Sequence, residues 1–134
     1  MFQKATAAVV FAFAVLFAAT ALQAQSVPQR VNVPFKFNLM DKSYEPAMYY
    51  FRYENSSNRL ELLDRNRALL TQVNVITRLA PAPGAIKGSH VRLVFDQVGQ
   101  DRFLSEVWMP GIDGLLVRAT SEQHQHQAVE GLMK

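Results

Sequence analysis

The sequence predicts an all-β protein, a small antiparallel meander of about 6–7 strands that forms a sandwich or a partly closed barrel. Three observations predict this fold. Apolar and polar residues alternate with a period of two over several short segments, polar turn residues separate these segments, and helical stripes are weak. About 110 residues follow the N-terminal signal described below, which is enough for one modest core.

The first expected strand covers residues 30–39, RVNVPFKFNL. Its odd positions are apolar and most of its even positions are polar, which is typical of a half-buried strand. The apolar positions are Val31, Val33, Phe35, Phe37 and Leu39. Pro34 lies on the polar side and removes one backbone donor, so we expect this strand at a sheet edge or at a bulge.

Three further strands are expected between residues 47 and 77. Residues 47–53, AMYYFRY, are rich in aromatic residues that favour strands, and residues 59–63, RLELL, place Leu60 and Leu62 on one face. Residues 68–77, ALLTQVNVIT, alternate again. The prolines and glycines of RLAPAPGAIKGS then predict a loop.

Residues 90–108, HVRLVFDQVGQDRFLSEVW, predict a hairpin around a glycine turn. The favoured register pairs Arg92 with Glu106 and Asp96 with Arg102, and each opposite-charge pair contributes a few tenths to about 1 kcal/mol. These charges then have a structural role rather than one in acid–base catalysis. An arginine beside each carboxylate favours its charged form and leaves a poor proton donor.

The chain after the hairpin predicts one more short strand and a tail. Pro110 and Gly111 suit a tight turn, and a strand over residues 115–118 follows. We therefore place the antiparallel β domain at residues 25–118. Residues 119–134 are a polar tail in which we expect a frayed helix or disorder.

Residues 1–24 have the plan of a secretory signal peptide, with a cationic start at Lys4, an apolar helix from Ala5 to Ala19 and small residues at the cleavage site. Cleavage is expected after Ala24, with Ala21 as the alternative. The apolar run of roughly 15 residues is shorter than the roughly 20 that span a bilayer. We therefore expect an exported protein, periplasmic or extracellular, with no stable membrane insertion after cleavage.

The composition excludes several chemistries. The chain contains no cysteine, which rules out disulfides, thiol nucleophiles and thiolate metal sites and favours a bacterial envelope over an animal secretory context. The net charge is +3, but the basic residues are spread along the chain, so we expect no nucleic-acid partner. Arg59, Arg65 and Arg67 are interpreted as a solvated turn rather than an anion-binding patch.

The candidate binding residues are Met48, Tyr50 and Arg52. If Tyr49, Phe51 and Tyr53 fill the core, this second set lies on the other face of the strand. Exposed aromatic residues beside an arginine can stack on sugars or receive a protein partner, although ordinary cross-strand packing is the alternative.

The histidines and serines give no expected metal, cofactor or catalytic residue. His124 and His126 lie on one side of a strand but diverge on a helix, and no carboxylate follows at a ligand spacing. Ser89 and His90 are adjacent, so in a strand they point to opposite faces and cannot form a nucleophile–base pair.

Three motifs, VNVPFKF, LVF before a glycine turn, and RFLSEVW, resemble a family of small exported β-rich proteins of unknown function that is common in acidobacterial genomes. The resemblance covers residues 31–108, with Met48 at a position where the family usually has glycine. It implies an exported β domain and names no catalytic residue.

We therefore expect an exported, non-enzymatic binding or envelope-interaction module. Its expected partners are an envelope polysaccharide, another envelope protein or a second copy of itself. The alternative is a small β-barrel carrier of an apolar ligand, which requires a cavity.

Overall fold

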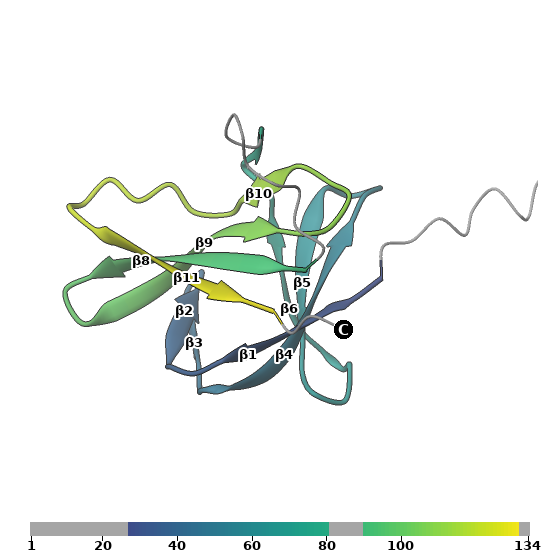
Figure 1. Ribbon diagram of the computed structural model, residues 1–134, viewed down its shortest axis with the longest axis horizontal. Helices are drawn as coiled ribbons and strands as arrows, with labels where there is room; N and C mark the ends of the chain where they lie inside the picture. The colour runs from purple at the N-terminus through teal and green to yellow at the C-terminus, as the bar shows by residue number, and fades with distance from the viewer. Residues whose placement is uncertain (1–26, 81–89, 132–134) are drawn as a thin grey trace, which may run out of the picture.

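Figure 1 shows the computed structural model, which describes residues 27–80 and 90–131. These residues form eleven strands: β1 Gln29–Val33, β2 Phe37–Leu39, β3 Lys42–Tyr44, β4 Ala47–Glu54, β5 Arg59–Leu63, β6 Leu69–Asn74, β7 Thr77–Leu79, β8 Arg92–Val98, β9 Asp101–Trp108, β10 Gly114–Leu116 and β11 Gln125–Glu130. No helix occurs in the described ranges, and the all-β prediction is confirmed. The strand number exceeds the prediction because four strands have only three residues.

The strands form two sheets. Sheet A has the antiparallel order β1-β4-β5-β6, and sheet B has the order β11-β8-β9-β10-β7. The hairpin β2–β3 joins sheet B through one parallel pairing between β2 and β9. In Figure 1, β8, β9 and β11 run across β4, β5 and β6. The described strands do not close into a barrel.

One core lies between the two sheets. Phe37 of sheet B, Phe51 of sheet A and Phe95 of sheet B are all 0% exposed, and burying a side chain of this size stabilises the fold by about 1.5–3 kcal/mol. The Phe37 ring meets Tyr49 at 5.4 Å and Phe95 at 5.5 Å between ring centroids, both edge to face. Because Tyr49 belongs to sheet A, these rings join the two sheets.

The segment predicted as one strand over residues 30–39 is divided at Pro34. β1 ends at Val33 as an edge strand of sheet A, and β2 begins at Phe37 in sheet B. The alternation nevertheless holds, since Val31, Val33, Phe37 and Leu39 are buried and Phe35 packs against the core. The edge position agrees with the missing backbone donor of proline.

The predicted register of the β8–β9 hairpin is wrong. Arg92 lies opposite Trp108, and Asp96 lies opposite Phe103, so neither predicted salt pair forms. Part of the reason is the turn. Gly99, with φ 63°, is followed by Gln100 in a two-residue connection, whereas the predicted pairing needs three residues.

A bulge adds a second register shift in the same hairpin. The shift falls between Val94, opposite Glu106, and Phe95, opposite Leu104, which leaves Ser105 as the extra residue. Ser105 is 3% exposed, and its hydroxyl donates to the carbonyl oxygen of Arg118 at 2.8 Å. The bulge therefore forms a hydrogen bond with the segment that follows β10.

The C-terminal segment also differs from the prediction. We expected a frayed helix or disorder in residues 119–134, but residues 125–130 form strand β11, which pairs antiparallel with β8. Its inward side chains include Gln127 and Val129, and the amide of Gly131 donates to Val91 O at 2.7 Å. Backbone pairing with β8 orders this segment despite its weak apolar pattern.

The short strand expected at residues 115–118 corresponds to β10, which pairs with β9 and β7. Gly111 has φ 80°, consistent with the expected tight turn. The expected signal peptide and most of the expected proline-containing loop lie outside the described residues. Within the described ranges there is no helix long and apolar enough to cross a membrane.

Candidate functional site

Strand β4 presents its side chains to two faces as the sequence predicts. Tyr49, Phe51 and Tyr53 are buried at 6%, 0% and 5% exposure, whereas Met48 and Tyr50 are partly exposed on the outer side of sheet A. Arg52 lies on the same outer side. We call this outer surface the Tyr50 face, defined by Arg30, Met48, Tyr50, Arg52 and Arg67.

Tyr50 lies beneath an arginine from the neighbouring β5–β6 turn. The guanidinium carbon of Arg67 is 5.0 Å from the centre of the Tyr50 ring, a cation–π arrangement. Asp64 fixes this turn, since its carboxylate accepts the backbone amides of Asn66 at 2.8 Å and Ala68 at 2.9 Å. Arg67 adopts a positive φ of 64° within it. The turn thus positions a cation over the aromatic ring.

Arg52 forms an ion pair with Glu61 within sheet A. Its Nε lies 2.5 Å from Oε1 of Glu61, the cross-strand neighbour, which is 5% exposed. The other Glu61 oxygen accepts from Gln72 Nε2 at 3.0 Å. The hydrogen bond to Glu61 raises the pKa of Arg52. Arg52 therefore has a structural partner, and less of its guanidinium faces a ligand than the sequence suggested.

Other arginines on sheet A carry uncompensated charge. Among the described residues, Arg30, Arg59 and Arg67 form no salt bridge, and Arg30 is the direct cross-strand neighbour of Tyr50. Arg59 donates instead to the neutral amide oxygen of Gln72 at 3.2 Å. The outer side of sheet A thus combines an aromatic ring with an excess of positive charge.

A second group of polar side chains lies on sheet B. The β8–β11 register places His126 directly opposite Asp96, and His126 Nδ1 is 2.8 Å from Asp96 Oδ1. His124 precedes β11 by one residue, and its Nε2 is 3.8 Å from the same oxygen. The two imidazole rings meet edge to face at 4.9 Å. We call Asp96, His124 and His126 the Asp96 cluster.

The segment between β10 and β11, residues 117–124, covers part of the outer side of sheet B and ends at His124. The amide of Val117 donates to Ser105 O at 2.8 Å, and the Arg118 guanidinium lies 3.9 Å from the centre of the Phe103 ring. Phe103 is the cross-strand neighbour of Asp96. This cover explains how Asp96, whose side chain is on the outer side of the sheet, is buried.

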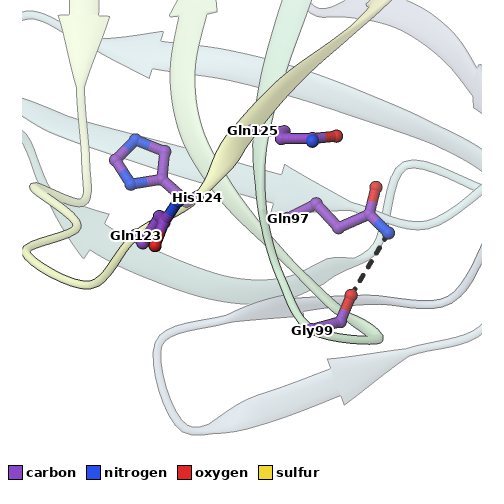
Figure 2. Close-up of a pocket in the computed structure, with 5 residues that line it drawn as sticks. All are labelled: Gln97, Gly99, Gln123, His124 and Gln125. Carbon is purple, nitrogen blue, oxygen red and sulfur yellow. Dashed lines mark hydrogen bonds between the residues drawn. The ribbon is translucent and has the colours of Figure 1, made fainter.

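A pocket of about 340 Å³ adjoins the cluster at His124. Figure 2 shows its other lining residues, Gln97 and Gly99 from the β8–β9 hairpin and Gln123 and Gln125 from the approach to β11. Gln97 donates to the carbonyl oxygen of Gly99 at 3.2 Å, which holds its amide over the turn. The pocket is polar and suits water or a small hydrophilic solute.

Sequence reasoning considered both histidines but missed Asp96 as their partner, because it assigned Asp96 to Arg102. In the structure Arg102 Nε donates to Gln127 at 2.9 Å instead. The carboxylate comes from 28 and 30 residues earlier in the chain, so spacing cannot reveal it. The remaining signal was the i, i+2 spacing of the histidines, which is the spacing of one strand face.

His90 has a separate environment. Its Nε2 is 3.2 Å from Glu130 Oε2, and its buried Nδ1 has no hydrogen-bond partner within residues 27–80 and 90–131. Ser89 lies outside the described residues, so the expected separation of Ser89 and His90 stays a prediction.

No family model matches this chain, and neither the curated proteins nor the solved structures contain a significant match.

Proposed function

We propose that this protein is an exported, non-enzymatic binding module that takes an acidic envelope polysaccharide on the Tyr50 face. The observation that carries the proposal is the Arg67 guanidinium, held 5.0 Å from the centre of the Tyr50 ring and forming no salt bridge with any carboxylate of the described residues. An anionic sugar uses both groups, since its ring packs against apolar surface and its charge pairs with the guanidinium.

The rest of the face supports an extended, polar ligand. Arg30 of the edge strand β1 lies beside Tyr50 of β4. Leu69 of β6, at the other edge of sheet A, is 50% exposed. A row of cationic and apolar groups across a sheet suits a chain-like ligand better than a compact one. The sequence features of export and the resemblance to exported β-rich proteins agree with an envelope ligand.

The test measures binding of the full chain to immobilised polygalacturonate, with uncharged dextran as the matched polymer. We expect salt-sensitive binding to the acidic polymer alone. Tyr50→Ala and Arg67→Gln should each weaken it by about tenfold, which corresponds to about 1.4 kcal/mol. Arg65→Gln is the control, because it removes an equal charge from the same turn without touching Tyr50.

Two results contradict the proposal. Equal retention on dextran would show that the face does not select charge. Equal losses in the Arg65 and Arg67 variants would show that net charge alone, and not the guanidinium over Tyr50, governs the binding.

A carrier of an apolar ligand is the second candidate. A pocket of about 350 Å³ between the sheets favours it, and its apolar lining includes Leu39, Met40, Ile76 and Val117. Met40 and Ile76 are 60% and 58% exposed, so the pocket opens to solvent. Titration with an apolar fluorescent dye tests this function, and Ile76→Ser should reduce the signal if the dye binds there.

A further inference from the structure

We propose that the Asp96 cluster is a binding site for a divalent transition metal of the zinc class, with one coordination position left to a solute from the adjoining pocket. This site is separate from the Tyr50 face, and its test does not depend on the proposed function.

The donor set selects the kind of metal. Two imidazole nitrogens and one carboxylate oxygen suit Zn²⁺ and its neighbours in the first transition row. Calcium and magnesium prefer ligand shells made of oxygen atoms, and the only oxygen ligand of this cluster is the Asp96 carboxylate. Zinc is therefore the metal to test first.

The donors already lie close to a coordination geometry. One donor atom from each residue lies within 4.8 Å of the other two. In a tetrahedral zinc site with bonds of 2.0–2.1 Å the donors are about 3.3 Å apart. The observed 2.8 Å for His126 and 3.8 Å for His124, each to Asp96 Oδ1, lie on either side of that value. Small side-chain rotations would bring both distances to that value, and the His126 side chain is 62% exposed.

Burial of Asp96 gives the site its electrostatic basis. Its side chain is 2% exposed, and none of the described lysines or arginines forms a salt bridge with it. A buried carboxylate without a cation is costly. A divalent ion bound by the two imidazoles supplies the positive charge that Asp96 lacks. The ion can reach this site from solvent because the His126 side chain is exposed.

Three protein ligands leave a fourth position on a tetrahedral metal. His124 belongs both to the cluster and to the pocket that Figure 2 shows, so the fourth position can be filled by water or a small anion in that pocket. The metal also joins β8, β11 and the segment that leads into β11. It therefore stabilises the pairing of the C-terminal strand β11 with β8.

The test is isothermal titration of the full chain, carrying no polyhistidine tag, with zinc chloride. We expect saturable binding of one zinc per chain. Removing a supporting partner of a metal ligand already costs about 10–100-fold in affinity, so Asp96→Asn, His124→Gln and His126→Gln should each lose at least tenfold. Cobalt should bind in the same place and give the intense visible absorption of a four-coordinate site.

His90→Gln is the matched control, because His90, two residues before β8, also lies beside a carboxylate, Glu130 of β11, but outside the cluster. Its zinc affinity should equal that of the wild type. Far-ultraviolet circular dichroism checks that each variant is folded. If Asp96→Asn is unfolded, His124→Gln decides, because His124 lies outside the strands.

Three outcomes overturn the proposal. They are no saturable zinc binding by the folded wild type, unchanged affinity in the folded cluster variants, and an equal loss in His90→Gln. The last result would assign the zinc to scattered surface histidines.

Discussion

The ion pair between Arg52 and Glu61 gives a quantitative test of how sheet A is stabilised. Replacing Arg52 by methionine keeps most of the side-chain volume but leaves the carboxylate of the buried Glu61 side chain without its cation. Breaking a buried pair in this way costs about 3–5 kcal/mol. The Arg52 side chain is 32% exposed and Gln72 still donates to Glu61, so we expect a loss below this range, about 2–3 kcal/mol.

The assay is urea unfolding at neutral pH, followed by circular dichroism. With an m value of about 1–3 kcal/mol/M, a loss of this size lowers the urea midpoint by about 0.7–3 M. The double variant Arg52→Met with Glu61→Leu removes both charges and should return to within about 1 kcal/mol of the wild type. Arg59→Met is the control on the same sheet, because Arg59 is exposed and has no ionic partner among the described residues.

A stability of Arg52→Met within about 0.5 kcal/mol of the wild type, the range of ordinary surface substitutions, would contradict a stabilising role of the ion pair. A double variant that is no more stable than the single one would contradict it as well. In that case the loss would come from the methylene packing of Arg52 and not from the uncompensated carboxylate.

Three further predictions concern turns, packing and pH. Gly114→Ala should cost about 1–3 kcal/mol in urea unfolding, because the added Cβ would lie 2.7 Å from the Trp108 ring. Gly99→Ala should cost about 1 kcal/mol from its φ of +63° alone, since nothing lies within 4 Å, and Gly99→Asn should cost less; equal costs would contradict the backbone explanation. Burial raises the pKa of Tyr44 and Tyr49 above 10.0, so stability should hold below that pH and fall as pH rises through the folded-state values; a urea midpoint unchanged above pH 10 would contradict this.

Local periodicity predicted the faces of the strands well. Tyr49, Phe51 and Tyr53 are buried and Val31 and Val33 fill the core, because alternation along one strand depends only on its own sequence. Pairing between strands was less predictable. The bulge at Ser105 and the two-residue turn at Gly99 moved the register, although the charges favoured another one.

The same limitation explains why the Asp96 cluster was missed. With the wrong register, Asp96 was assigned to Arg102 within the hairpin, and the histidines were left in a tail without a partner. Strand β11 has polar side chains on both faces apart from Ala128 and Val129, so its sequence gives little apolar signal. Its place is determined by backbone hydrogen bonds to β8, which no pattern within residues 125–130 encodes.

The chain passes between the two sheets at residues 34–36, 45–46 and 75–76. Each passage is so short that neither sheet can detach without pulling strands out of the other. Denaturation should therefore proceed in a single step, with the fluorescence of Trp108 and the signals of the tyrosines in β4 lost together. The three short connections therefore make the two sheets one unfolding unit.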